Sequence, residues 1–185
     1  MFKLIKIIKS DLARYEKPNI IIFIKRALLD TNFISVMLYR LSHQIYLWRI
    51  PLLPKVIMNI NKIMFSAEIS YTAKIGYGFR INHSLGIVIG GGANIGDNFT
   101  INQGVTIGGN FGKNRYEGNK LISQPWIAEK VSVGAGAKIL GPVIIGNNVI
   151  IGANSLVIKD ITDCQVVAGI PAKVIKERRD IHATK

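Results

Sequence analysis

The sequence is poor in the residues on which several common kinds of protein site depend. It holds one cysteine, Cys164, and three histidines in 185 residues. A single cysteine excludes an internal disulfide and suits a reducing compartment, so we expect a cytoplasmic protein. A zinc site needs several histidine, cysteine or carboxylate ligands to converge, and these few scattered residues do not offer that. We therefore predict that the protein uses no metal.

Long uncharged apolar runs are also missing, although 49% of the residues are hydrophobic. No stretch approaches the roughly 18 to 20 residues that a membrane-spanning helix needs. Lys3, Lys6 and Lys9 interrupt the only apolar start, so we expect no signal peptide. A GxxxxGK[ST] loop is absent too, which argues against a nucleotide triphosphatase. Without a zinc-finger or RNA-recognition motif, nucleic acid is not a predicted partner.

Acidic residues are scarce beside basic ones. The chain has 11 Asp and Glu against 24 Lys and Arg, a formal net charge of +13. The imbalance is steepest in residues 1–67, which hold 11 basic and 3 acidic side chains. Such a surface attracts nucleic acid, anionic lipid or phosphorylated small molecules, or it simply keeps the protein in solution.

What the sequence has in abundance is an aliphatic residue at every sixth position between residues 69 and 162. A period of six fits neither an α-helix nor a plain strand, and hexapeptide periods indicate a β-helix in which three short strands form a triangular coil. Glycines beside the repeat suit the corners of such coils. We predict a mainly β fold. The two runs, the first with a two-residue slip after its third member, are Ile69, Ile75, Ile81, Ile89, Ile95, Ile101 and Ile107, and Ile127, Val133, Ile139, Ile145, Ile151 and Val157. Small or apolar residues follow four places after many of them, at Phe79, Ala93, Val105, Val131, Ala137, Val143 and Val149.

Residues 1–66 form a different region, which we predict to be helical. Periodic apolar residues and the prolines between them indicate helical segments at residues 2–16, from about residue 30 to Arg49, and at residues 55–65. Residues 20–29 are dense in Ile, Phe and Leu. The region is apolar and basic at once. It could cap the first coil or form an oligomer interface, which we favour, or it could lie on a membrane surface. Both roles can hold together.

The remaining chain divides into the β-helix, residues 67–176, and a short C-terminal tail, residues 177–185. The charged terminus from Lys176 onward is expected to be a frayed helix. One polar, glycine-containing insertion, residues 108–125, interrupts the repeat, and we predict a loop there. Long loops that leave a rigid solenoid are where binding residues often lie.

Among the histidines, His83 is the candidate for chemistry. It lies at the slip in the repeat, where a side chain can be re-aimed, and imidazole can accept a proton near neutral pH. A surface histidine at a coil corner is the alternative. Glu68, fifteen residues earlier, can lie on the adjacent coil and orient the ring. His43 and His182 are expected to be a partly buried structural residue and a solvated one.

These features resemble the hexapeptide-repeat acyltransferases, in particular their serine acetyltransferase-like branch. The resemblance covers residues 67–176, and the start of the chain is similar to members tied to surface polysaccharide synthesis. It implies a left-handed parallel β-helix and a homotrimer or dimer of trimers, with acetyl-CoA bound in the cleft between neighbours. It is carried by the segments AKIGYGFRINHSLGIVIG, NQGVTIGG, VGAGAKILGPVIIGNNVIIGANSLVIKDI and VAGIPAKVI.

The resemblance also implies roles for individual residues. His83 would be the general base that activates an acceptor hydroxyl, with Glu68 in the place of the aspartate that orients it. Gly109 would lie beside the thioester, where its backbone N–H could stabilise the oxyanion. The other implied CoA contacts are two small residues along the pantetheine arm and one basic residue near the phosphates, namely Ala135, Ala153 and Lys173.

The sequence departs from this family where free serine would be held. An aspartate and an Arg-His pair are replaced by Asn82 and by Ser123 and Gln124. An amino acid needs charged partners for its carboxylate and ammonium groups, so neutral residues favour a sugar hydroxyl. Arg115 or Lys113 could restore a carboxylate contact. We therefore expect a polysaccharide O-acetyltransferase that acts on a small-molecule or glycan acceptor, and peripheral contact with the inner membrane face would bring it near such an acceptor. The alternatives are a serine O-acetyltransferase and an inactive β-helix scaffold.

Overall fold

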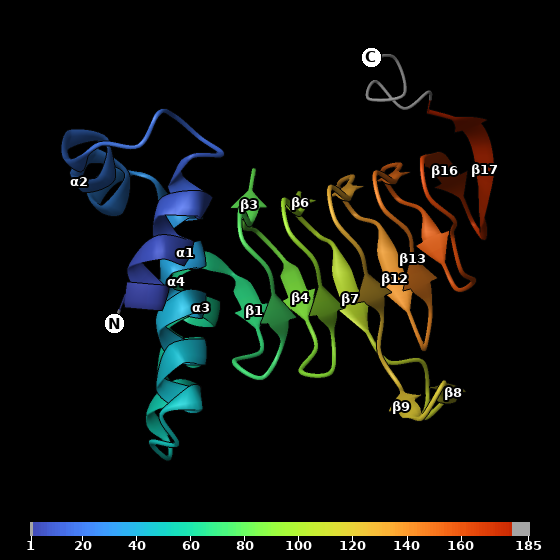
Figure 1. Cartoon of the computed structure of the whole chain (residues 1–185), viewed down its shortest axis with the longest axis horizontal. Helices are drawn as coiled ribbons and strands as arrows, with labels where there is room; N and C mark the ends of the chain where they lie inside the picture. Colours follow the sequence, from blue (N-terminus) through green and yellow to red (C-terminus); the bar gives the residue numbers. More distant parts are fainter. Residues whose placement is uncertain (1, 179–185) are drawn as a thin grey trace.

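The computed structural model describes residues 2–178 and confirms the predicted parallel β-helix. Helices pack at one end, and the coils follow one another along the long axis of the molecule (Figure 1). Three sheets, here called A, B and C, form the sides of the prism. Sheet A contains β1 (Ala67–Ile69), β4 (Ile87–Ile89), β7 (Thr106–Gly108), β12 (Lys138–Leu140) and β15 (Leu156–Val157). Sheet B contains β2 (Lys74–Ile75), β5 (Asn94–Ile95), β10 (Trp126–Ile127) and β13 (Ile144–Ile145). Sheet C contains β3 (Arg80–Ile81), β6 (Thr100–Ile101), β11 (Ser132–Val133), β14 (Ile150–Ile151), β16 (Gln165–Gly169) and β17 (Ala172–Glu177).

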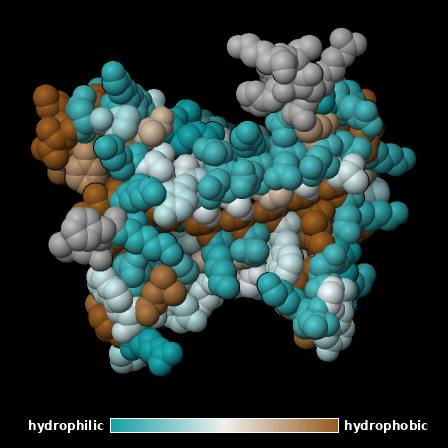
Figure 2. Space-filling view, in the orientation of Figure 1, coloured by the Kyte–Doolittle hydropathy of each residue, from teal (hydrophilic) through white to brown (hydrophobic). Residues whose placement is uncertain are grey.

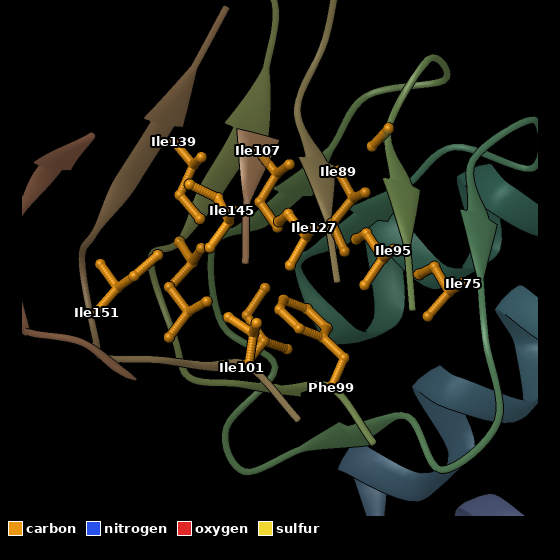
Figure 3. Packing of buried hydrophobic residues seen from close by; sticks show 14 of the residues in the cluster. Ile75, Ile89, Ile95, Phe99, Ile101, Ile107, Ile127, Ile139, Ile145 and Ile151 are labelled. Carbon is orange, nitrogen blue, oxygen red and sulfur yellow. The ribbon is translucent and has the colours of Figure 1, made fainter. Parts of the chain in front are cut away.

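The core of the β-helix is built from the residues that define the repeat. Every member of both six-residue runs is buried, and so are the residues that follow four places later. Equivalent positions stack between coils, as in Ile89, Ile107 and Ile139 of sheet A (Figure 3). Burying one such aliphatic side chain contributes about 1.5–3 kcal/mol before the entropic cost of ordering it. The aliphatic column therefore dictates the coil.

The two-residue slip lies in the turn between β3 and β4. Ile81 pairs with Ile101, twenty positions later, whereas Val88 pairs with Thr106, eighteen positions later. The extra residues are thus accommodated between Ile81 and Val88, in the turn that carries His83. A lengthened turn lets the histidine leave the regular path of the coil.

This corner of the prism requires left-handed backbone conformations. Gly86, Gly104 and Gly136 have φ values of 72°, 68° and 72°, and Asn154 takes the place at the next coil with φ 56°. Residues with a Cβ rarely adopt such values, apart from asparagine. Close stacking adds a second demand at Gly134, where a Cβ would lie 2.5 Å from the backbone nitrogen of Ala153.

The helical region contains the three predicted helices, of which the first ends earlier than predicted, and a fourth over the apolar residues 20–29. They are α1 (Phe2–Leu12), α2 (Ile20–Leu29), α3 (Thr31–Leu47) and α4 (Leu53–Phe65). Asp30 caps α3, because its carboxylate accepts hydrogen bonds from the backbone N–H groups of Asn32 and Phe33. No helix within residues 2–178 has the length and apolar character needed to cross a membrane.

A buried ion pair joins α1 to α3, and its two residues also hydrogen-bond to the first coil. The carboxylate of Asp11 and the guanidinium of Arg40, 0% and 2% exposed, meet at 2.8 Å. Arg40 also donates to the carbonyls of Ile75 and Gly76, and Asp11 accepts from the backbone N–H of Phe79. The helices therefore cover the open end of the solenoid, as one of the two interpretations predicts.

Two local predictions were wrong. The insertion is not an irregular loop throughout, because β8 (Arg115–Glu117) and β9 (Lys120–Ile122) form an antiparallel hairpin that projects from the prism (Figure 1). The start of the C-terminal tail is not helical, since β17 continues to Glu177 and pairs antiparallel with β16. His182 lies outside the described residues.

Candidate active site

His83 lies in the turn between β3 and β4, at the corner where sheet C passes into sheet A. Its side chain is exposed, whereas Ile81 and Ser84 on either side are buried. A fixed backbone with an outward imidazole is the arrangement that a proton-transfer group needs.

Residues of the helical region hold this turn in place. The side-chain amide of Asn32, at the start of α3, donates to the carbonyl of Asn82 over 2.9 Å and accepts from the N–H of Ser84 over 2.9 Å. The Tyr15 hydroxyl donates to the carbonyl of Ile81 and accepts from its N–H. Burial raises the pKa of Tyr15 to about 12, so the hydroxyl keeps its proton. These contacts fix the backbone from Ile81 to Ser84.

The Asn82 side chain, predicted to contact the acceptor, begins a short hydrogen-bonded ladder across the coils. Its Nδ2 donates to Oδ1 of Asn102 over 3.1 Å, and Nδ2 of Asn102 donates to the carbonyl of Val133 over 2.8 Å. Asn82 therefore has a structural partner on the neighbouring coil.

Glu68 lies on β1, the strand next to β4, and is paired in register with Val88. Its carboxylate forms an ion pair with Lys62 of α4 at 2.5 Å. Among the described contacts, Glu68 makes no hydrogen bond to His83. The predicted role of Glu68 in orienting the imidazole stays a prediction.

The predicted pantetheine contacts lie in the same column of corner residues as the His83 turn. The carbonyl of Ala135 accepts a hydrogen bond from the N–H of Asn154, just as the carbonyls of Leu85 and Gln103 accept from the next coil. Ala135 and Ala153 are therefore equivalent residues of successive coils. Because they are small, they leave room along this edge of the prism.

Three more predicted residues, Gly109, Ser123 and Gln124, lie at a second corner, where sheet A passes into sheet B. Gly109 lies near Ser123, whose carbonyl oxygen would be 3.6 Å from a Cβ at Gly109. Gln124 packs over the glycines of the preceding coil, where its Oε1 would be 2.2 Å from a Cβ at Gly90. Within the described residues this oxygen is buried without a hydrogen-bond partner.

Arg115 lies apart from both corners' turns, whereas Lys173 lies at the corner of the His83 turn, because its partner Ala168 stacks on Gly152, with its Cβ 2.8 Å from the place of a Cβ at Gly152. Arg115, on β8, is ion-paired with Asp160 at 2.8 Å and with Glu117 at 3.5 Å. It thereby ties the hairpin to the last coil. Lys173 is exposed on β17, opposite Ala168 of β16.

The two corners are separated by the width of sheet A. At β4 the extended chain between the His83 turn and Gly90 is the three residues Ile87–Ile89, about 10 Å. Figure 2 shows hydrophobic residues along the middle of this side of the β-helix, bordered by hydrophilic ones. Lys138, which the sequence analysis missed, lies on this face and donates to the Gly104 carbonyl and to Thr106 Oγ1. One chain therefore does not bring all predicted site residues together.

His43 is structural, as predicted. Its ring stacks on Tyr39 with centroids 5.8 Å apart, and its Nδ1 lies 2.8 Å from the carbonyl of Tyr71. Burial lowers the pKa of this imidazole, and the nearby Arg40, Lys3 and Lys74 lower it further.

Comparison with known proteins points to one group of enzymes. Residues 125–159 match the family described as bacterial transferase hexapeptide (six repeats). The chain is 41% identical over 145 residues to the serine acetyltransferase of Synechococcus elongatus, covering 78% of this chain and 57% of that protein. It is 35% identical over 179 residues to that of Staphylococcus xylosus, covering 96% and 80%. The crystal structure of Brucella abortus serine acetyltransferase in complex with coenzyme A superposes with a TM-score of 0.82 at 29% identity, covering 96% and 69%.

Proposed function

The chain belongs to the hexapeptide-repeat acyltransferase family, and from this premise we propose that it transfers the acetyl group of acetyl-CoA to the hydroxyl of L-serine. The observation that carries the proposal is the similarity to serine acetyltransferases over nearly the whole chain, helices included. It revises the sequence-based preference for a sugar acceptor in favour of what that analysis gave as the alternative.

In this proposal the imidazole of His83 takes the proton from the serine hydroxyl as the oxygen attacks the thioester carbonyl. The tetrahedral intermediate then collapses, the C–S bond breaks, and the imidazolium returns the proton to the thiolate of CoA. The N–H of Gly109 stabilises the oxyanion, and Glu68 orients the ring. The hydrogen bonds from Asn32 and Tyr15 to the His83 turn support this assignment, because a general base must be held within reach of its proton.

The proposal includes a homotrimer. The corner that carries His83, between sheets C and A, is here called the histidine corner, and the corner that carries Gly109, between sheets A and B, the Gly109 corner. They are at opposite edges of sheet A in one chain, so a site that uses both needs a neighbouring protomer. Parallel packing of prisms brings the histidine corner of one chain toward the Gly109 corner of the next. Acetyl-CoA then lies in the cleft between them, along Ala135 and Ala153, with Lys173 near its phosphates.

A sugar hydroxyl is the second candidate acceptor. Asn82, Ser123 and Gln124 are neutral, and the guanidinium of Arg115 is engaged by Asp160 and Glu117. These positions offer hydrogen bonds rather than partners for the carboxylate and ammonium groups of an amino acid.

The test is the release of free thiol from acetyl-CoA by the full chain, with L-serine, D-serine and a panel of sugars as acceptors. We expect release that depends on L-serine and is lost in His83→Ala. Release with a sugar but not with L-serine would overturn the serine assignment and leave the acyltransferase standing. Equal release by His83→Ala would remove His83 from the mechanism.

A further inference from the structure

We propose that α2 docks the protein on an anionic lipid bilayer by inserting its outward apolar face. The inference is independent of the acetyl-transfer proposal, because none of its residues belongs to the candidate active site. It rests on the exposure of α2, on a groove beside it, and on the unpaired lysines around it.

The outward face of α2 is apolar apart from Lys25. The helix contributes no fully buried residue. Ile20, Ile24 and Leu28 form one row at four-residue spacing, and Ile21, Lys25 and Leu29 form the adjacent row. Ile21, Leu28 and Leu29 are 72%, 71% and 77% exposed. A short helix at the surface of a water-soluble domain normally turns such residues inward.

The opposite side of α2 is fastened to the protein, so the apolar face is held outward. Phe23 packs edge-on against Phe33 with centroids 6.3 Å apart. Arg26 lies over the ring of Tyr15 at 5.2 Å and is ion-paired with both Glu16 and Asp30. Figure 1 shows α2 at the end of the molecule far from β17, and Figure 2 shows hydrophobic residues gathered there.

A groove between α1 and α2 extends the apolar surface. Its volume is ≈ 440 Å³, and its walls include Ile5, Ile8 and Leu12 of α1 with Ile20 and Phe23 of α2. Lys9 is the one charged residue among the described residues that line it. An apolar groove with a single cation suits an acyl chain that ends in an anionic headgroup.

The charges around this surface favour an anionic partner. All three acids of residues 2–30 are neutralised within the protein, Asp11 by Arg40 and Glu16 and Asp30 by Arg26. In the described ion pairs none of the exposed lysines of this segment takes part. Of these, Lys9 lines the groove and Lys17 and Lys25 lie next to α2 and on it, whereas Lys3 and Lys6 lie on the side of α1 that faces the β-helix.

A second copy of the chain docked on the same face would bring Lys9, Lys17 and Lys25 against their counterparts, whereas anionic lipid headgroups attract them. The length of the helix fits a position in the plane of the interface. Ten residues span about 15 Å, half the thickness of the hydrocarbon core. Charge and length together favour the bilayer.

The test is flotation of the full chain with vesicles of phosphatidylcholine, with and without about a third phosphatidylglycerol. We expect binding to the anionic vesicles that weakens at high salt. Ile21→Ser with Leu28→Ser should lower the partition coefficient by about tenfold or more, and Lys17→Glu with Lys25→Glu should do the same at low salt. The matched control is Ile63→Ser with Met64→Ser, which changes two exposed apolar residues of α4, 79% and 66% exposed, and should leave binding intact.

Three outcomes would overturn the proposal. The first is no flotation of the wild-type chain with anionic vesicles. The second is binding that survives the α2 variants or is lost in the α4 control. The third is a change in molar mass, measured by light scattering without vesicles, caused by Ile21→Ser with Leu28→Ser, because the face would then be an interface between copies. Circular dichroism and thermal unfolding establish that each variant folds, and the charge-reversal pair tests the proposal separately if the serine pair does not fold.

Discussion

The side-chain amide of Asn32 donates a hydrogen bond to the backbone carbonyl of Asn82 over 2.9 Å. The same amide accepts a hydrogen bond from the N–H of Ser84, so one residue of α3 is hydrogen-bonded to the chain on both sides of His83. A helix that caps the solenoid thus also sets the position of the candidate base.

Replacing Asn32 should impair acetyl transfer more than it impairs folding. Asn32→Asp retains an acceptor for Ser84 but loses the donor to Asn82, and we expect kcat to fall by about 10- to 100-fold because a small displacement of a base is costly. Steady-state kinetics measure the effect, with Asn19→Ala, which removes the α2 cap at Ile22, as the control. An unchanged kcat would show that the turn keeps its shape without this amide.

Mixing two inactive variants should restore activity if the site lies between protomers. His83→Ala removes the base from one corner, and Gly109→Trp fills the other. After co-expression at equal levels, about a quarter of the interfaces would combine an intact histidine corner with an intact Gly109 corner. Thiol release from the mixture is compared with that of each variant alone. No gain over the separate variants would place the whole site within one chain and contradict the proposed trimer site.

The ion pair between Asp11 and Arg40 should matter for stability. Burial raises the pKa of the Asp11 carboxyl and Arg40 opposes that shift, so Arg40→Met leaves a buried acid without its partner. We expect a loss of about 3–5 kcal/mol in the free energy of unfolding. Urea denaturation measures it. The double variant Arg40→Met with Asp11→Asn should be less destabilised than the sum of the single variants, and simple additivity would argue that the two groups do not interact.

Stability should fall in mild acid because of His43. Burial lowers the pKa of this imidazole in the folded protein, so the unfolded chain binds a proton that the folded protein does not. The free energy of unfolding therefore decreases as the pH drops below the unfolded-state value of about 6.5. His43→Gln keeps a donor for the Tyr71 carbonyl and should flatten this dependence between about pH 7.5 and pH 5.5. Parallel pH profiles for the variant and the wild type would show that another group is responsible.

Local patterns in the sequence were sufficient to predict the six-residue repeat and the helical region. A buried aliphatic residue at every sixth position is a local requirement, so Ile127, Ile139 and Ile151 could be placed in the core without knowing their neighbours. The slip after Ile81 likewise marked the turn of His83. Contacts between residues far apart in the chain leave no comparable signal in the sequence. The ion pair of Arg115 with Asp160 and the hydrogen bond of Asn32 to Asn82 could therefore not be predicted from local patterns.

By itself the sequence determined a hexapeptide solenoid with a helical, basic start and an outward histidine at the irregular turn, because each of these depends on periodicity or on residues close together in the chain. Only the tertiary structure decided that His83 and Gly109 occupy different corners, that the insertion and residues 165–177 form hairpins, and that α2 turns its apolar face away from the protein. These features depend on which distant segments meet, and that choice is made by the packing of the whole chain.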